Sequence, residues 1–477
     1  MVSILGANSA SDSYEVSNSL RFNDDDDAAL SRSVSGNLSK AHTFSLWIKR
    51  ANLKGSGRHT LIAMGDGSGD ISWLELNNDR LAIVFDGSGT YWPKTDAVLR
   101  DVSAWYHICV AVDTTESTAA NRVKFYINGV QFTDTNGTFP PLNHQAVMDA
   151  CVVGYNPGDE FDGYMAEVHV LDGVAYGPTY FGKFDNNNVW VPIEYTGGNY
   201  GTFGFYLEFK QTGTSQNSSG IGADTSGNDN HFAVTNLAAT DVTTDTCTNN
   251  YATMSTIHPS ASNFTISEGN LKISKSGTGT VGLYGQTLMA TSGKWYFEVK
   301  IVTRGTSDRT RVGIANYESV TGTSTIQDSY SGLEISTAES DKIFTVVDGS
   351  TTENETFYTA LSDNDIVRFA VDMDNGRLYL GVNGNWWNYS SSQTGGDPTS
   401  GSGYVTDNTT IFNGSPMTAY SAHSAGLSTS SVQEFNFGNP TFAISSGNSD
   451  ANGYGNFEYA VPSGYYAYNT KNLAEFG

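Results

Sequence analysis

Apolar and polar residues alternate along most of the chain with the two-residue period of β-strands. In the stretch HTFSLWIKR, the side chains of Phe44, Leu46 and Ile48 share one face of such a strand. The same alternation returns in AWYHICVAVD, in NRVKFYINGVQF and in GKWYFEVKIV. The first two hundred residues contain no long helical period. The pattern therefore predicts an all-β protein.

Tight turns separate these strands, and both halves of the chain use Asn-Gly for them. Asn128-Gly129 lies in the first half, and Asn375-Gly376 and Asn383-Gly384 lie in the second. Asn-Gly is the strongest short hairpin signal, because both central residues of the tight turn adopt positive φ angles. Many short strands with regularly spaced turns are typical of β-sandwiches. Since each half has its own set, we predict two β-sandwich domains in tandem.

A change in composition suggests where the two domains meet. The stretch KQTGTSQNSSGIGADTSGNDN is rich in Gly, Ser and Asn, as loops and linkers are. We expect a first sandwich over residues 18–210, a linker over residues 211–254, and a second sandwich with an aromatic C-terminal tail over residues 255–477. Residues 1–17 have too few apolar positions for a core, so we expect this segment to dock on a neighbouring subunit or on the first sandwich.

The net charge of the chain limits the kinds of molecule that it can bind. Asp and Glu number 50 against 25 Lys and Arg, which gives a formal net charge of −25. Such a field repels phosphate backbones, so we expect no nucleic-acid partner. Two explanations of the surplus of acidic residues remain open: it keeps the protein soluble, or it binds divalent cations.

The cysteines and the apolar segments favour folding in a reducing cytoplasm. Three cysteines are present, an odd number, and no pair has the spacing of a metal site. The start of the sequence lacks the pattern of a signal peptide, and no run approaches the roughly 20 apolar residues of a membrane span. We therefore expect neither a disulfide-stapled domain nor a membrane-spanning one.

Several motifs, taken in order, resemble known domain families. FSLWIKR, WYHICVAVDTT, VKFYINGVQF and FDGYMAEVHVLDGVAY are similar to the ordered motifs of LamG or concanavalin A-like domains, over residues 18–210. SGKWYFEVKI, RVGIA, DIVRFAVDMDNGRLYLGVNGNW and the closing FNFG resemble the motifs of SPRY domains, over residues 255–440. The resemblance implies a jelly-roll or concanavalin-like sandwich followed by a SPRY-like one.

The combination of both domains with the flanking stretches SNSLRFNDDDDAALSR and PSGYYAYNTKNLAEFG resembles structural proteins of marine bacteriophages, of the tail-fibre or virion type. The resemblance implies a non-enzymatic protein on the virion surface, made in the host cytoplasm. Its partners would be other virion proteins of the tail or capsid and, through its loops, host-surface polysaccharide. A symmetric particle favours a homo-oligomer, and we expect a trimer. The fold alone does not fix this function.

Glycan binding requires exposed aromatic rings next to polar groups. Tyr91 and Trp92 lie in the loop-like stretch DGSGTYWPK, and Trp386 and Trp387 lie in VNGNWWNYS. Neighbouring residues of a strand point to opposite faces, so one member of each pair is exposed or lies at an interface. We take these four residues as candidates for contact with a glycan or a protein partner; packing between domains or subunits is the alternative.

Calcium is a further candidate ligand, although the fold requires no cofactor. LamG-like domains hold calcium through Asp and Asn on loops, and the resemblance implies Asp66, Asp70, Asp224, Asn228 and Asp229 as ligands. Oxygen-rich loops with glycine suit a hard cation with six to eight ligands. The alternative is that these residues form turns and bind nothing.

A catalytic function is not expected. In EFDGYMAE, a regular strand would place Glu167 on the face opposite Glu160 and Asp162, whereas glycoside hydrolysis requires paired carboxylates about 5–9 Å apart. No Gly-x-Ser-x-Gly elbow is present, and His107 has the position of a packed strand residue. A tailspike-type enzyme that degrades polysaccharide is the alternative, and a purely architectural capsid decoration protein is a second one.

Overall fold

The structure divides into two compact units, which are described separately. It is a computed structural model, and the units are Gly6–Asn250 (the first unit) and Tyr251–Gly477 (the second unit). The residues described are 14–65, 72–87, 90–133, 135–256, 264–277, 281–305, 309–317, 330–336, 340–347, 350–357, 360–388, 393–407, 411–423 and 427–477. Nearly all regular structure in them is β-strand, which confirms the all-β prediction.

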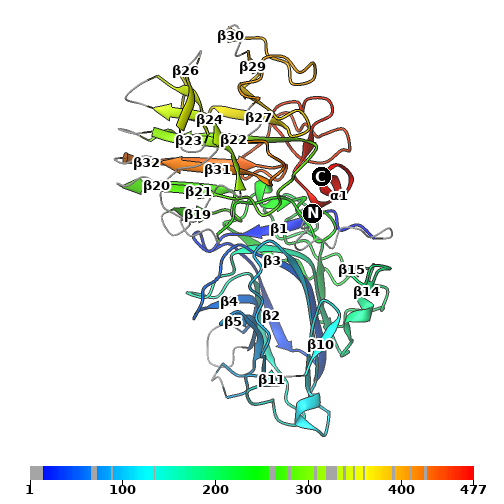
Figure 1. The fold of residues 1–477 in the computed structure, drawn as a ribbon. Coiled ribbons are helices and arrows are strands. Elements are labelled where there is room, and N and C mark those ends of the chain that lie inside the picture. Colours follow the sequence, from blue (N-terminus) through cyan, green and yellow to red (C-terminus); the bar gives the residue numbers. More distant parts are fainter. Residues whose placement is uncertain are drawn as a thin grey trace. The chain divides into compact units, whose positions relative to one another are not determined.

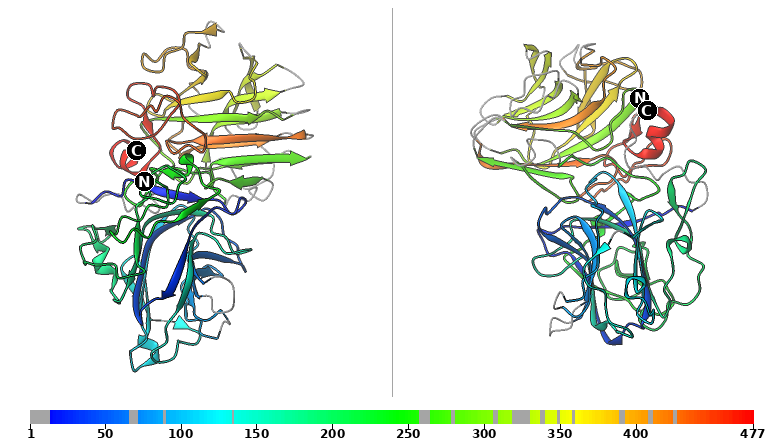
Figure 2. Two further views of the ribbon diagram at one scale, coloured as in Figure 1. Left: turned by 180° about the vertical axis from the view of Figure 1, so that it is seen from behind. Right: turned by 60° about the horizontal axis from the view of Figure 1, so that its bottom comes forward.

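Two antiparallel sheets form the first unit (Figures 1 and 2). The first, here called the β13 sheet, has the order β10-β9-β8-β3-β13-β1-β18, and β16 also pairs with β13. Its strands are β1 (Ser19–Phe22), β3 (Ala41–Arg50), β8 (Trp105–Asp113), β9 (Val123–Ile127), β10 (Val130–Phe132), β13 (Gly163–Asp172), β16 (Phe205–Leu207) and β18 (Val242–Thr243).

The second sheet, here called the β5 sheet, has the order β11-β7-β6-β5-β4-β12-β2-β17. Its strands are β2 (Ala29–Asn37), β4 (Arg58–Met64), β5 (Ser72–Asn77), β6 (Arg80–Val84), β7 (Lys94–Thr95), β11 (Thr135–Asn136), β12 (Val147–Val153) and β17 (Ala233–Thr235). Outside both sheets lie the hairpin β14 (Gly182–Phe184) and β15 (Trp190–Pro192) and the 3₁₀ turns η1 (Ala119–Asn121), η2 (Pro178–Tyr180) and η3 (Ala239–Asp241).

The strand alternation read from the sequence places the core between these two sheets. Phe44, Leu46 and Ile48 of β3 are fully buried and pack in one cluster with Leu74 and Leu76 of β5. The opposite face of the β13 sheet is also covered, by a second cluster that includes Trp47, Trp105, Trp190 and Cys247. The sheet is therefore buried on both faces, which explains why outward-pointing residues such as His107 are buried as well.

The predicted hairpin at Asn128-Gly129 is confirmed. Ile127 pairs with Val130, and the φ angles of the two corner residues are 47° and 78°. A Cβ atom added to Gly129 would lie 2.2 Å from the ring of Trp190. The corner therefore requires glycine for its backbone conformation and for its contact with the outer layer.

The prediction of a linker over residues 211–254 is wrong for residues 211–250, which belong to the first unit. In this segment β17 pairs with β2, β18 pairs with β1, and Phe232 is fully buried in the core. The composition of the segment was misleading because its few apolar residues are widely spaced among turn residues. Polar groups hold most of it in place, and such contacts leave no periodic pattern in the sequence.

A buried ion pair fixes the end of this segment to the outer face of the β13 sheet. The Oδ2 atom of Asp245 accepts a hydrogen bond from Lys49 Nζ at 2.8 Å, and Oδ1 accepts one from Trp105 Nε1 at 3.1 Å. Lys49 also donates to Asn250 Oδ1 at 2.7 Å. Both charges are almost fully buried, so removing one partner would leave the other uncompensated.

The chain before β1 also lies on the first unit. The backbone N–H of Val16 donates to Thr248 Oγ1 at 3.2 Å, and that hydroxyl donates to the Val16 carbonyl at 3.1 Å. Of the segment expected to dock, residues 14–17 are thus held on the first sandwich, and residues 1–13 lie outside the described residues.

The second unit has two further antiparallel sheets (Figure 1). The order β19-β20-β32-β22-β27-β28-β29-β30, with β33 beside β22, is formed by β19 (Thr265–Ser267), β20 (Lys272–Gly277), β22 (Lys294–Thr303), β27 (Ile366–Asp372), β28 (Arg377–Val382), β29 (Asn385–Asn388), β30 (Gln393–Thr394), β32 (Leu427–Asn436) and β33 (Tyr466–Ala467). The order β21-β31-β23-β24-β25-β26 is formed by β21 (Val281–Tyr284), β23 (Arg309–Asn316), β24 (Tyr330–Ser336), β25 (Lys342–Val347), β26 (Ser350–Thr356) and β31 (Met417–His423).

Apolar residues of both sheets meet in one core in the second unit. The rings of Phe297 and Phe369 stack with their centroids 4.6 Å apart, and Val312 and Leu333 of the other sheet join the same cluster. The prediction of two separately cored β-sandwiches is therefore confirmed. The chain ends in the short helix α1 (Thr470–Phe476), capped by the Asn469 side chain. In the described parts of the chain, no helix has the length and apolar character needed to cross a membrane.

The packing of residues 211–250 predicts where the chain can be cut. A fragment of residues 1–250 should be soluble and melt cooperatively. A fragment of residues 1–210 should not, because it loses β17, β18 and the buried partner of Lys49. Breaking a buried ion pair costs about 3–5 kcal/mol, a large part of the 5–15 kcal/mol of a typical domain. Thermal unfolding of both fragments, followed by circular dichroism, measures this; equal midpoints would contradict the assignment.

Candidate functional site

A β-bulge in β13 brings an acidic residue to the outer face of its sheet. The register between β13 and β3 shifts between Ala166 and His169, and Glu167 has a φ angle of 51°. Ala166 packs in the outer cluster, whereas Val168 packs in the core between the sheets. The bulge therefore breaks the alternation and places Glu167 on the same side as His169.

The carboxylate of Glu167 is held by three side chains. Its Oε2 atom accepts hydrogen bonds from the hydroxyls of Tyr206 at 2.7 Å and Tyr14 at 2.9 Å, and His169 Nε2 lies 3.8 Å away. Burial acts to raise the pKa of Glu167, but the contacts with His169, Tyr206 and Tyr14 outweigh it and hold this pKa below its usual value. Glu167 is therefore a buried anion at neutral pH.

Aromatic rings stack in order above this carboxylate. The ring of His169 lies 4.0 Å from that of Tyr206 at an angle of 12°, and its Nδ1 atom lies 2.9 Å from the Tyr200 hydroxyl. The rings of Tyr200 and Tyr206 are nearly parallel with centroids 6.3 Å apart. The rings of Tyr195 and Tyr200 are inclined at 61°, with centroids 5.2 Å apart. The rings are thus fixed in their orientations before any ligand is present.

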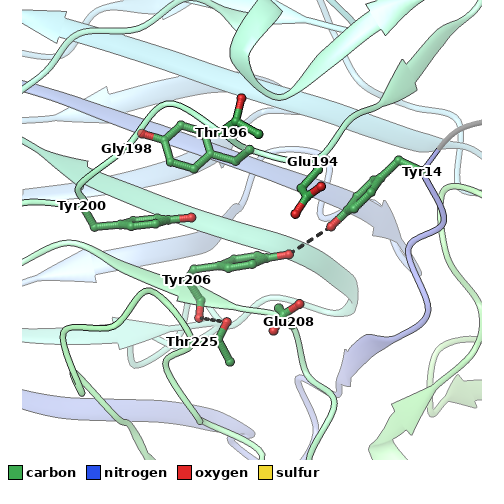
Figure 3. Close-up of a pocket in the computed structure, with 9 residues that line it drawn as sticks. Tyr14, Glu194, Thr196, Gly198, Tyr200, Tyr206, Glu208 and Thr225 are labelled. Carbon is green, nitrogen blue, oxygen red and sulfur yellow. Dashed lines mark hydrogen bonds between the residues drawn. The ribbon is translucent and has the colours of Figure 1, made fainter.

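These rings line a pocket of about 370 Å³ (Figure 3). Its lining residues come from four separate segments of the first unit: Tyr14, Glu194, Tyr195, Thr196, Gly198, Tyr200, Tyr206, Glu208 and Thr225. Figure 3 shows the hydroxyls of Tyr14 and Tyr206 meeting at 3.3 Å, on the side of the pocket where the two glutamates lie. The lining contains four tyrosines, two glutamates and no basic side chain.

The tyrosine hydroxyls remain hydrogen-bond donors over the physiological range. Burial raises the pKa of Tyr195 to about 12 and raises those of Tyr14, Tyr200 and Tyr206 further. The Tyr195 hydroxyl is buried and has no hydrogen-bond partner among the described residues. The hydroxyl protons of Tyr14 and Tyr206 are already donated to Glu167, so the pocket offers ring faces together with hydroxyl and carboxylate oxygens that accept hydrogen bonds, which is chemistry suited to a polyhydroxylated ligand.

Sequence reasoning missed this pocket. The signal available was the aromatic density of IEYTGGNYGTFGFYLEF, which begins at Ile193. These residues could not be assigned to a site, because Tyr14 precedes the first strand and Thr225 lies in the segment taken for a linker. Only the folded outer layer brings them together with the bulge in β13.

The first predicted aromatic pair precedes β7 and divides between the two faces of the β5 sheet. Tyr91 packs against the core, with its ring 6.0 Å from that of His144. Trp92 lies on the other side and donates from Nε1 to Glu75 Oε1 at 3.0 Å. Trp92 is thus available on the surface, whereas Tyr91 is a packing residue.

Trp73, which the sequence analysis did not single out, completes a second aromatic surface. Its Nε1 donates to Glu75 Oε2 at 2.7 Å, so Glu75 holds both indoles. The guanidinium of Arg58 and the ammonium of Lys94 lie 5.4 and 4.1 Å from the ring of Trp92. These cations cover part of the ring surface that a ligand would need.

The second predicted pair separates in the same way. Trp387 is 1% exposed and packs on Phe357 at 5.1 Å in the core of the second unit, so the prediction that it contacts a ligand or partner is wrong. Trp386 is partly buried, and the guanidinium of Arg368 lies 4.2 Å above its ring. The strand ladder decides this outcome, since β29 turns only one of two neighbours toward the core.

Of the predicted calcium ligands, Asp66 and Asp70 lie outside the described residues, and Asp224 has a structural role. The Oδ1 atom of Asp224 accepts from the backbone N–H groups of Tyr206 at 2.8 Å and Ser226 at 2.9 Å. Its Oδ2 atom accepts from the backbone N–H of Asn230 at 2.8 Å and the Ser226 hydroxyl at 2.9 Å. The carboxylate is thus already engaged by four donors.

The two remaining candidates do not join Asp224 in a ligand set. Asn228 turns its amide group to donate to the carbonyls of Gly201 at 2.7 Å and Gly204 at 3.0 Å. The Asp229 side chain is 88% exposed. Within the described residues, no group of three or more His, Cys, Asp or Glu side chains is arranged to hold a metal ion. Asp224, Asn228 and Asp229 shape a loop instead.

The face predicted for Glu167 from strand parity is wrong. The bulge reverses the parity that a regular strand would give Glu167. Its carboxylate nevertheless has tyrosine partners, whereas Glu160 lies 3.7 Å from Lys54 Nζ. The predicted packing of His107 is confirmed: it is fully buried and accepts from Trp190 Nε1 at 3.0 Å.

Glu75 gives the second aromatic surface a pH dependence. Burial raises the pKa of Glu75 from 4.5 to about 7, against the opposing effects of Arg58 and the two indole N–H groups. A carboxyl whose pKa is higher in the folded state stabilises the fold most below pH 4.5, and this stability is lost as pH rises toward 7.

We therefore expect the free energy of unfolding of the first unit to fall by on the order of 2–3 kcal/mol between pH 4.5 and 7.5 through this group. Glu75→Gln should flatten that part of the profile, because glutamine does not titrate. Urea unfolding at a series of pH values measures it, with Glu116→Gln as the control. Identical profiles for Glu75→Gln and the unaltered protein would refute this role.

Comparisons with solved structures give only weak likenesses. Mouse laminin α1 chain domains LG4-5 align with 13% identity and a TM-score of 0.27, covering 87% of this chain and 84% of that one. A heptameric SAP-like pentraxin from Limulus polyphemus aligns with 14% identity and a TM-score of 0.27, covering 34% of this chain and 80% of that one. The SPRY domain of human HERC1 aligns with 11% identity and a TM-score of 0.24, covering 35% of this chain and 87% of that one. At these values we draw no conclusion from them.

The sequence itself gives one informative match. It has no significant match among curated protein sequences. Residues 22–176, however, match the family model described as the concanavalin A-like lectin/glucanases superfamily. These residues include β13 with its bulge and most of both sheets of the first unit. The first unit therefore contains a concanavalin A-like domain.

Proposed function

We propose that this chain is a non-enzymatic carbohydrate-binding protein displayed on the surface of a bacteriophage virion. The observation that carries the binding function is the pocket of four tyrosines and two glutamates on the outer face of the β13 sheet. The match of residues 22–176 to a lectin and glucanase family model supports a sugar as its ligand.

The chemistry of the pocket suits a sugar ring. A pyranose has an apolar C–H face and a rim of hydroxyl groups. The rings of Tyr195 and Tyr200 can pack against the apolar face of the sugar. The tyrosine hydroxyl oxygens, together with Glu194 and Glu208, can accept hydrogen bonds from its hydroxyl groups. The volume of about 370 Å³ lies within the range of about 300–1,000 Å³ that small-molecule sites have.

The virion role rests on the resemblance of the whole chain to phage structural proteins. In this proposal the hydrogen-bonded sheets hold the binding loops rigidly, other virion proteins of the tail or capsid hold the chain, and the pocket contacts host-surface polysaccharide. The protein is made in the host cytoplasm and assembled as a homo-oligomer, which we expect to be a trimer. The second sandwich, with its SPRY-like motifs, would supply further contacts with partners.

An enzymatic function is less well supported. In the first unit, Glu75 has the raised pKa that a general acid needs, at about 7. It is, however, fully buried, and both its oxygens accept indole N–H groups. An acid held in this way cannot reach a glycosidic oxygen. A purely architectural decoration protein would have no use for the tyrosine pocket, so the binding function is favoured over both alternatives.

Binding to immobilised and soluble glycans tests the proposal. The full chain should bind at least one glycan class, and Tyr195→Ala should weaken that binding about tenfold or more, because it removes one wall of the pocket. Tyr180→Ala is the matched control, since Tyr180 is exposed, lies outside the pocket lining and stacks on Tyr176. Incubation with the bound glycan should release no reducing ends. Binding that Tyr195→Ala leaves unchanged would remove the pocket from the proposal.

Calcium binding stays a prediction, and thermal melting tests it. If Asp66 and Asp70 hold calcium, the melting temperature of the full chain should rise in calcium and fall in chelator, because a ligand that binds only the folded state stabilises it. A melting temperature that does not move would exclude a calcium site of useful affinity. Asp224→Ala should lower the melting temperature in both conditions, because its four hydrogen bonds are lost.

A further inference from the structure

We infer that the sugar bound by the tyrosine pocket carries a free, positively charged amino group. This inference rests on the proposed function, because it assigns a ligand class to the same pocket. It follows from three properties of the described residues: the charges that line the pocket, the orientation of its rings, and the lack of any lining Lys, Arg or His side chain.

The first property is a surplus of negative charge. Glu194 and Glu208 line the pocket, and Glu167 lies behind the hydroxyls of Tyr14 and Tyr206. Lys210 pairs with Glu208, and His169 lies beside Glu167. Lys210 offsets the charge of Glu208, whereas the exposed carboxylate of Glu194 has no cationic partner among the described residues. The pocket is therefore negative overall.

The second property is the arrangement of the rings. The ring of Tyr195 is inclined at 61° to that of Tyr200, and Tyr200 lies parallel to Tyr206 within 6°. His169 covers one face of Tyr206, which also lines the pocket. Ring faces carry the negative end of the aromatic quadrupole and attract ammonium groups. Rings on several sides with carboxylates at the rim form a site for an organic cation.

The third property excludes acidic sugars. A uronate or a sialic acid in the pocket would place its carboxylate beside Glu194 and Glu208 with no lining Lys, Arg or His to compensate. Juxtaposed like charges oppose binding, and the net charge of −25 strengthens this effect at longer range. A neutral sugar meets no such penalty, but it gains no charge-assisted hydrogen bond.

The expected preference is moderate, because Glu194 is exposed and water screens its charge. One partly exposed ion pair together with one cation–π contact gives about a tenfold difference in affinity. This is smaller than the preference of a fully enclosed cation site, and it is well within the resolution of titration calorimetry.

Three tetrasaccharides with the same β-1,4-linked glucose backbone test the inference on the full chain. They carry at carbon 2 an amine, an acetamide or a hydroxyl, and a galacturonate tetramer serves as the anionic probe. At pH 6, where the amine is protonated, we expect the amine form to bind about tenfold more tightly than the acetamide and hydroxyl forms, which are neutral. The galacturonate form should not bind measurably.

Two variants assign the preference to the pocket. Glu194→Gln and the double variant Glu194→Gln with Glu208→Gln should lower the ratio of amine to hydroxyl affinity toward one. Asp25→Asn, which removes one charge from an exposed turn, should leave that ratio unchanged. A ratio that stays near ten in the double variant would overturn the role of these carboxylates.

The outcomes separate this inference from the proposed function. Equal affinity for the amine and hydroxyl forms would overturn the inference and leave carbohydrate binding intact. Absence of binding by all four probes would also overturn it. The proposed function itself falls only if the wider glycan set used with Tyr195→Ala shows no binding either.

Discussion

A single extra residue in β13 decides what the outer face of its sheet can do. A regular strand would turn Glu167 toward the core, where an unpaired carboxylate is very costly. The bulge turns it outward instead, at a φ angle that residues other than glycine adopt rarely. Tyr14, Tyr206 and His169 then gather around the carboxylate, and their positions define the floor of the pocket.

The outer layer that completes the pocket is held by polar contacts together with the packing of Tyr195 and Tyr200 on Phe181. Lys49 and Asp245 form a buried ion pair that fixes residues near 250 to β3, and Asp224 uses four hydrogen bonds to shape the loop that bears Thr225. Contacts of this kind stabilise little compared with an apolar core, but they are directional. They therefore fix where the rings lie, whereas the core between the sheets supplies the stability.

The two aromatic surfaces of the first unit differ in how open they are to a ligand. Around Trp92, a buried glutamate accepts the indole N–H and two cations lie near the ring. Groups of the protein therefore already occupy the hydrogen-bond donor and part of the ring surface that a ligand would use. In the tyrosine pocket, by contrast, Tyr195 keeps a hydroxyl with no partner among the described residues, and Glu194 is exposed. Unused polar capacity next to fixed ring faces is what separates a binding site from a packing cluster.

The sequence by itself determined most of the strands and their faces and the Asn128-Gly129 corner, because the two-residue period and positive φ angles are local properties that each stretch carries alone. The Asn375-Gly376 turn differs from the prediction, because Asp372 pairs with Arg377 and Asn375 has no positive φ angle. The alternation was enough to predict two sandwiches and to place Phe44, Leu46 and Ile48 in a core. It could not identify residues 211–250 as part of the first unit, show that Trp387 is buried, or locate the pocket. Those features depend on contacts between residues far apart in the chain, such as Tyr14 with Glu167 and Lys49 with Asp245, and on one bulge that reverses strand parity. Only the tertiary structure decides them, because a hydrogen bond between distant residues leaves no periodic trace in the sequence.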